Sequence, residues 1–120
     1  MATREIPRDH WREELDSFSR QHEGWIVRVD VTEPTGNTRT EAHDVPLQGV
    51  SVDAPGRPGL AVIVGHEPGD HLTHEISNPV DIAIEQSGGA DRALRIRSGD
   101  GSTTTVEFRS PGQSPEQSSR

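Results

Sequence analysis

The first quarter of the chain gathers most of its aromatic side chains into one helix-turn-strand unit, and this constrains the fold more than any other feature. Both tryptophans and one of the two phenylalanines lie there. One stripe of side chains recurs at spacings of four, three and four residues: Trp11, Leu15, Phe18 and His22. This spacing predicts an amphipathic helix over about residues 9–23 that buries the stripe. Gly24 follows, as is typical of a residue that ends a helix in the left-handed conformation.

The segment 25–31 alternates between apolar and charged residues, with Trp25 and three valines on one face and Arg28 and Asp30 on the other. Such alternation predicts a half-buried strand. We expect the helix stripe to cover the apolar face of this strand. Residues 4–25 are therefore predicted to close the core.

Short apolar or alternating segments continue along the chain and are separated by turn residues. Further strands are predicted at residues 39–44, 47–52, 60–64, 71–77, 80–86, 93–98 and 103–109. Asp100-Gly101 is a strong hairpin signal, and Asn78-Pro79 is expected to interrupt or bulge the sheet. The predicted fold is α+β, with one N-terminal helix packed on a twisted, partly rolled antiparallel meander of about six to eight short strands. Residues 1–110 are expected to form one domain, and residues 111–120, which have no apolar anchor, a disordered tail.

Composition excludes several classes of protein. The chain has no cysteine, so disulfides and thiolate chemistry are excluded. No apolar run approaches the ~18 residues of a membrane span, and the N-terminus lacks a signal-peptide core. We therefore expect a cytoplasmic protein without a membrane partner. The net charge of −8 argues against a nucleic-acid partner, because phosphate contacts require a basic surface.

Every basic residue other than histidine is arginine, and lysine is absent. A GC-rich genome explains this bias, and adaptation to a salty cytoplasm is a second explanation. Neither identifies a function.

Residues 66–75 hold the only local cluster of chemically versatile side chains. A type II turn there would make His66 and His71 cross-strand neighbours, flanked by Glu67 and Asp70, and two imidazoles beside carboxylates suit a divalent metal. An ordinary polar hairpin tip explains the same residues, so these four are weak candidates and no metal site is assigned. His74 would point to the opposite face, as a half-buried histidine bonded to the backbone or to a glutamate.

The remaining polar residues have structural explanations. His22 ends the helix, where the dipole favours a cation. Arg28, Arg95 and Arg97 could form a small anion-binding patch, but a solvated strand face balanced by nearby carboxylates explains them better. We assign no catalytic residue and no cofactor.

Several motifs together resemble a bacterial family catalogued as domain of unknown function 5335. The motifs are Arg4-Glu-Ile-Pro-Arg-Asp9, Trp11, Phe18-Ser19, His22, Gly24-Trp25, Pro46-Leu-Gln-Gly49, Leu72-Thr-His74, Asn78-Pro79, Asp100-Gly and Phe108-Arg-Ser-Pro111. The resemblance covers about residues 3–111. It implies a small, cytoplasmic, single-domain bacterial protein and carries no catalytic residue across.

Three functions remain open. The leading hypothesis is a non-enzymatic binding or interaction module, whose edge strands could pair with a protein partner or a second copy. The first alternative is a small metal-dependent enzyme or metal-binding protein that uses the His66 and His71 hairpin. The second is a protective protein related to salt or stress.

Overall fold

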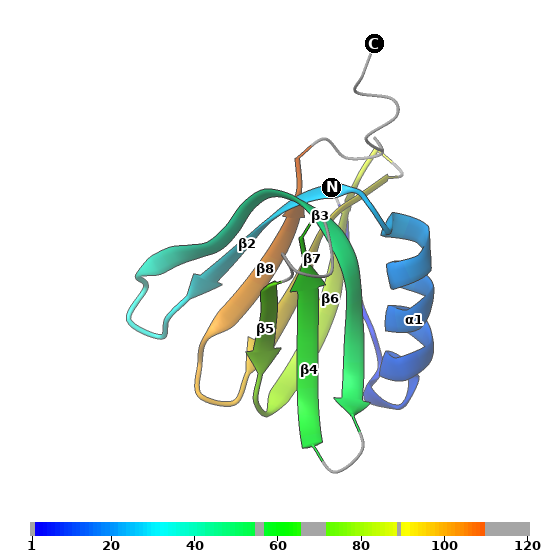
Figure 1. The fold of residues 1–120 in the computed structure, drawn as a ribbon. Helices are drawn as coiled ribbons and strands as arrows, with labels where there is room; N and C mark the ends of the chain where they lie inside the picture. The colour runs from blue at the N-terminus through cyan, green and yellow to red at the C-terminus, as the bar shows by residue number, and fades with distance from the viewer. Residues whose placement is uncertain (1, 55–56, 66–71, 89, 110–120) are drawn as a thin grey trace.

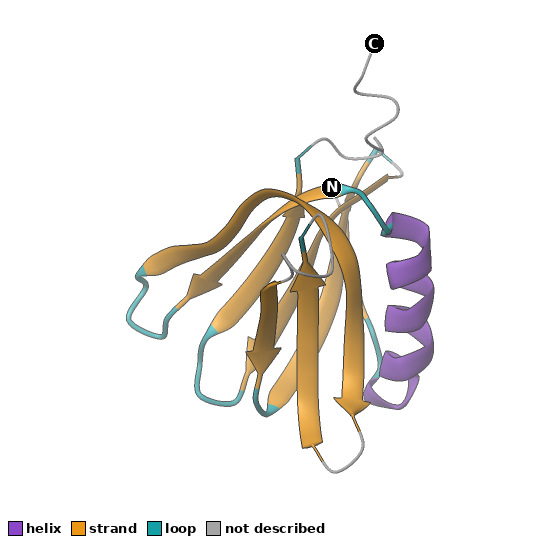
Figure 2. Cartoon of the chain, in the orientation of Figure 1, coloured by secondary structure: helices purple, strands orange, loops and turns teal. Residues whose placement is uncertain are grey.

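A computed structural model describes residues 2–54, 57–65, 72–88 and 90–109 of the chain. The helical segments are η1 (Arg8–His10), a 3₁₀ turn, and α1 (Trp11–His22). The strands are β1 (Ala2–Glu5), β2 (Ile26–Thr32), β3 (Thr38–Ala54), β4 (Arg57–Val64), β5 (Leu72–Ile76), β6 (Pro79–Ser87), β7 (Ala90–Ser98) and β8 (Thr103–Phe108). Strands dominate the fold, and α1 lies along one side of them (Figures 1 and 2).

All eight strands belong to one open antiparallel sheet in the order β1-β6-β7-β8-β2-β3-β4-β5. The α+β class is thus confirmed, but the expected single meander is wrong. Two meanders, β2 to β5 and β6 to β8, are joined because β2 pairs with β8. The edge strands are β1 and β5.

The helix is preceded by a strand, so the prediction of an N-terminal helix needs correction. β1 pairs with β6, with Thr3 opposite Glu85. Thr3, Arg4 and Glu5 are all exposed. With no apolar alternation to reveal it, this strand is specified by backbone pairing alone.

A single long strand, β3, replaces the two strands predicted at 39–44 and 47–52. Its first part pairs with β2 and its second part with β4. Between Val27 and Val29 the register shifts, and Asp44 there has a φ of 56°. A left-handed residue absorbs the extra length of a β-bulge and bends the strand without ending it. Figure 1 shows β3 curving from the β2 side of the molecule to the side where α1 lies.

The predicted helix stripe is confirmed as the buried face of α1. All four of its side chains are buried, and Leu15 is fully enclosed. Full burial of a leucine side chain contributes about 1.5–3 kcal/mol. The other large side chains that are fully enclosed come from strands in both halves of the sheet: Leu47, Ile82, Ile84, Leu94, Ile96, Val27, Val29, Val62, Val64 and Val106.

Ser19 fixes the helix to the strand beneath it. Its hydroxyl oxygen accepts the Val50 N–H at 2.8 Å and lies 2.8 Å from the Leu15 carbonyl, to which it donates. Gly49 faces this hydroxyl, and a Cβ there would lie 3.6 Å from the same oxygen, in ordinary van der Waals contact. α1 is therefore held against β3, and its first turn is placed beside the ends of β3 and β4.

The turn residues Asn78-Pro79 interrupt the sheet as predicted, because β5 ends before them and β6 begins at Pro79. Across the described residues, no helix is long and apolar enough to cross a membrane.

Candidate functional site

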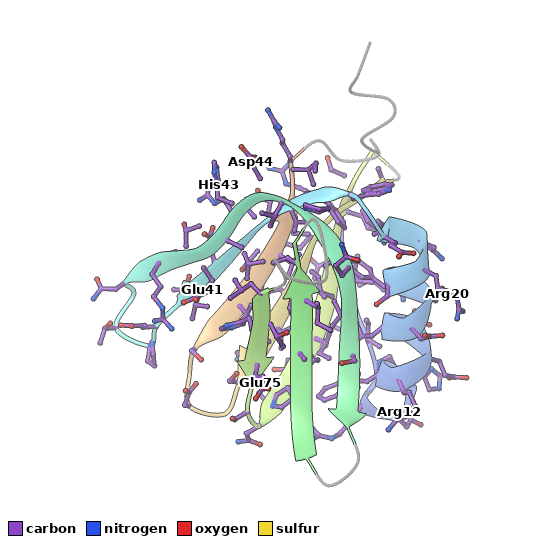
Figure 3. The ribbon with its side chains drawn as sticks, viewed as in Figure 1. Arg12, Arg20, Glu41, His43, Asp44 and Glu75 are labelled. Carbon is purple, nitrogen blue, oxygen red and sulfur yellow. The ribbon has the colours of Figure 1, made fainter. Side chains whose placement is uncertain are left out.

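A pocket of about 580 Å³ lies where the start of α1 meets the lower ends of the strands. We call it the arginine pocket. Its polar lining comes from Arg8, Asp9, Arg12, Ser77 and Asn78. Its other walls are Trp11, Val52, Gly59 and Pro79. Figure 3 shows Arg12 at this end of α1, with Arg20 further along the helix.

The two pocket arginines differ from every other arginine side chain that the structure describes. The others each have a carboxylate oxygen within 4.0 Å: Arg4, Arg20, Arg28, Arg39, Arg92, Arg95, Arg97 and Arg109. Neither Arg8 nor Arg12 has an ion-pair or hydrogen-bond partner within the described part of the chain. A guanidinium stays charged at any physiological pH and offers five N–H donors. The two guanidinium groups therefore present ten N–H donors that have no protein acceptor among the described residues.

Arg8 is positioned by Trp11. Its guanidinium carbon lies 4.6 Å from the centroid of the indole ring, and such a cation–π contact contributes about 0.5–1 kcal/mol at an exposed site. The indole is itself fixed, because its Nε1–H donates to the Ile6 carbonyl at 2.9 Å. The planar fork of Arg8 is thus oriented before any ligand arrives.

Both arginines stand where the helix dipole disfavours a cation. Arg8 lies in η1 and Arg12 in the first turn of α1, next to the positive end of the helix. Glu13 and Glu14 also lie in that turn, but Glu14 is paired with Arg4 at 3.3 Å. The placement of Arg8 and Arg12 lowers helix stability and raises the positive potential of the pocket.

Asn78 closes the pocket in a strained conformation. Its φ is 53°, which asparagine tolerates better than most residues. The Asn78 carbonyl accepts the Gly99 N–H at 2.9 Å, which ties the β5–β6 turn to the β7–β8 turn. Strained residues held by their surroundings cluster at ligand sites.

His22 has a structural position, as its sequence context predicts. The ring is buried at the end of α1, where Nδ1 lies 2.8 Å from the Phe18 carbonyl and Nε2 lies 3.1 Å from Asp91 Oδ2. Both neighbours are acceptors, and each ring nitrogen faces one of them. Ring centroids of Phe18, Trp25 and Phe108 lie 4.3, 4.6 and 4.8 Å from that of His22. With both nitrogens engaged, His22 cannot act on a substrate.

The strand arginines form the solvated face that the sequence favours over an anion patch. Arg28 pairs with Asp30 at 2.9 Å. Arg95 and Arg97 pair with Glu85 and Asp81, respectively. Their charges are neutralised locally.

His74 is half-buried, as predicted, but its observed partner is neither the backbone nor a glutamate. Its Nε2 lies 3.3 Å from the Thr104 hydroxyl on β8. Burial lowers the pKa of His74 below its ordinary value; Glu41 opposes this shift and Arg39 adds to it.

The four weak metal candidates, His66, Glu67, Asp70 and His71, lie outside the described residues, as does the predicted tail. Within the described ranges, no group of three or more histidine, aspartate or glutamate side chains is placed to hold a metal ion. The metal site at His66 and His71 therefore stays a hypothesis from the sequence.

Sequence reasoning missed the arginine pocket. Arg12 lies outside the helix stripe predicted to be buried, and Arg8 has no distinctive pattern around it. One signal was available: two arginines four residues apart at a helix start, where acidic residues are preferred. The strand residues that complete the pocket could not be assigned without the fold.

Comparison with known proteins agrees with the resemblance seen in the motifs. The profile of a family of unknown function, DUF5335, matches residues 2–117. An uncharacterised protein of Aquifex aeolicus (strain VF5) is 27% identical over 96 residues, which cover 80% of this chain and 82% of the relative. No solved structure matches the chain. The family match spans nearly the whole sequence, and the chain belongs to the family of unknown function DUF5335.

Proposed function

We propose that the protein is a non-enzymatic binding module that takes the anionic group of a small ligand in the arginine pocket. One observation carries the proposal: Arg8 and Arg12 line the same pocket, and they alone among the described arginine side chains lack a carboxylate partner. Carboxylate and phosphate oxygens fit the planar fork of a guanidinium in bidentate pairs.

The size and charge of the molecule favour a small ligand. Pockets for small molecules commonly measure roughly 300–1,000 Å³, and this one measures about 580 Å³. The net charge of −8 repels polyanions at long range. A local positive pocket on an acidic protein suits a compact anion better than a nucleic acid.

The lining of the pocket favours binding over catalysis. Among the described residues, the lining includes no histidine, and Ser77 has no hydrogen-bonded base. A hydroxyl without a base is a poor nucleophile. The guanidinium, hydroxyl and amide groups of the lining hold and orient a ligand, and Asp9, its one carboxylate among the described residues, has no hydrogen-bonded nucleophile there.

The proposal is tested by isothermal titration with inorganic phosphate and with acetate. Charged hydrogen bonds contribute about 1.5–3 kcal/mol each, so Arg8→Gln with Arg12→Gln should weaken binding about ten-fold or more. Arg20→Gln is the matched control, since Arg20 lies on the same helix and pairs with Asp16. Equal affinity in the double variant and the wild type would contradict the proposal.

A further inference from the structure

We infer that the ligand of the arginine pocket is a small zwitterion of the α-amino-acid class, whose carboxylate meets Arg8 and Arg12 and whose ammonium group meets Asp9. The inference rests on the proposed function and assigns the second charge of the ligand. Asp9 is the one carboxylate among the described residues that line the pocket.

Asp9 is unpaired despite its two cationic neighbours. Within the described residues it has no ion-pair or hydrogen-bond partner, although Arg8 is adjacent and Arg12 is three residues away. Ion pairs form readily at three- and four-residue spacings on helices. Asp16 and Arg20, both on α1, form such a pair, whereas Asp9 lies in η1 and Arg12 in α1. The charges in the pocket remain separate.

The stacking of Arg8 explains part of this separation. The indole holds the guanidinium 4.6 Å from its ring centroid, so Arg8 is engaged by Trp11 and not by Asp9. Two guanidinium groups and one carboxylate thus line the same pocket. A ligand with a carboxylate and an ammonium group satisfies both signs at once, whereas a simple anion leaves Asp9 as a like charge beside it.

The overall charge of the protein points the same way. With a net charge of −8, the protein repels an anion before it reaches the pocket. A zwitterion carries no net charge and does not experience this repulsion. Val52 and Pro79 supply an apolar wall for its side chain, and Asn78 supplies a neutral polar group.

The test begins with thermal-shift measurements on the full chain with each of the twenty common amino acids, followed by titration calorimetry on the best one. Its N-acetyl form keeps the carboxylate without the ammonium charge, and its amide keeps the ammonium charge without the carboxylate. Each modification should weaken binding about ten-fold or more, because each removes a charged hydrogen-bonding group.

Three variants separate the two charges. Asp9→Asn should abolish the preference for the free amino acid over its N-acetyl form, with the affinity for the N-acetyl form unchanged or increased. Arg8→Gln with Arg12→Gln should weaken both forms together. Glu13→Gln is the control for loss of an exposed carboxylate near the helix start and should change neither. Unfolding curves of the unliganded variants establish that each one is folded.

The outcomes distinguish this inference from the proposed function. If phosphate or the N-acetyl acid binds through Arg8 and Arg12 as well as any amino acid does, the zwitterion is wrong and the anion-binding function stands. If none of the amino acids produces a thermal shift while phosphate binds, the zwitterion is again wrong and the anion-binding function stands. If neither phosphate, acetate nor any amino acid binds, both are overturned.

Discussion

Replacing Asp91 by alanine should make the protein markedly easier to unfold. The Asp91 carboxylate lies 3.1 Å from His22 Nε2 and also accepts a hydrogen bond from Gln86 at 2.8 Å. The His22 side chain is 4% exposed and that of Asp91 is 17% exposed. Alanine would leave the two groups that face this carboxylate, His22 Nε2 and the Gln86 amide, without their partner. An unsatisfied buried polar group costs about 1–3 kcal/mol, so the two together place this case near about 3 kcal/mol.

The loss is large compared with the total stability. A chain of this size unfolds with roughly 5–15 kcal/mol, so the variant would lose a fifth or more of it. With a urea dependence of about 1.5 kcal/mol per molar, the midpoint should fall by roughly 2 M. Urea titration followed by tryptophan fluorescence is well suited, because Trp25 packs edge-on against the His22 ring.

A double-mutant cycle with His22→Leu isolates the pair. His22→Leu alone leaves the carboxylate without its main partner, whereas the double variant leaves no unpaired charge. We expect the double variant to be more stable than the sum of the single losses implies, by about 2 kcal/mol. Additive losses, or a loss below about 1 kcal/mol for Asp91→Ala, would show that the pair does not stabilise the end of the helix.

Three further predictions follow from the fold. Because burial lowers the pKa of His74, the unfolded chain binds more protons than the folded one below about pH 6.5. Acidification from pH 7 to 5 should therefore destabilise the wild type more than His74→Gln. An identical pH dependence of the urea midpoint in the two proteins would contradict this. Gly59→Ala should lower the free energy of unfolding by about 1–3 kcal/mol, since φ is +138° and the new Cβ would lie 2.8 Å from the Ile76 carbonyl oxygen. Gly36→Ala is the control, because φ there is +101° but the space around it is open; it introduces backbone strain without the close contact and should cost less stability. Gly99→Ala should displace the Asn78 side chain, with which its Cβ would collide, and weaken ligand binding at unchanged global stability; unaltered calorimetric affinity would exclude Asn78 from the site.

The parts of the fold that sequence predicts are those set by local periodicity. The spacing of Trp11, Leu15 and Phe18 determines which face of α1 is buried. The alternation of Val27, Val29 and Val31 does the same for β2, whose burial pattern follows it. These patterns arise within one element and need no knowledge of its neighbours.

The missed features all depend on contacts between distant segments. β1 exists because β6 offers an edge to pair with, and its own residues carry no apolar pattern. β3 continues through Asp44 because its pairing with β2 resumes after a shift in register. The same holds for the pair of His22 with Asp91, since nothing near His22 in sequence indicates a carboxylate from β7.

The arginine pocket lies between these two cases. Its cations are local, since Arg8 and Arg12 are four residues apart at a helix start. Its other walls come from the ends of β3 and β4 and from the β5–β6 turn, which only the folded sheet brings there. The absence of carboxylate partners for these arginines within the described chain is likewise visible only in three dimensions.

The central claim is that an anion binds at Arg8 and Arg12, and the two tryptophans allow it to be tested at a defined place. Trp11 lines the pocket at the start of α1, and Trp25 lies beyond the other end of this helix, which is about 18 Å long. The indole N–H resonances of both can be followed by NMR while inorganic phosphate or an amino acid is added. We predict a saturable shift of the Trp11 resonance, a stationary Trp25 resonance, and loss of the shift in Arg8→Gln with Arg12→Gln. A Trp11 resonance that does not move, or that moves equally in the double variant, would contradict the account.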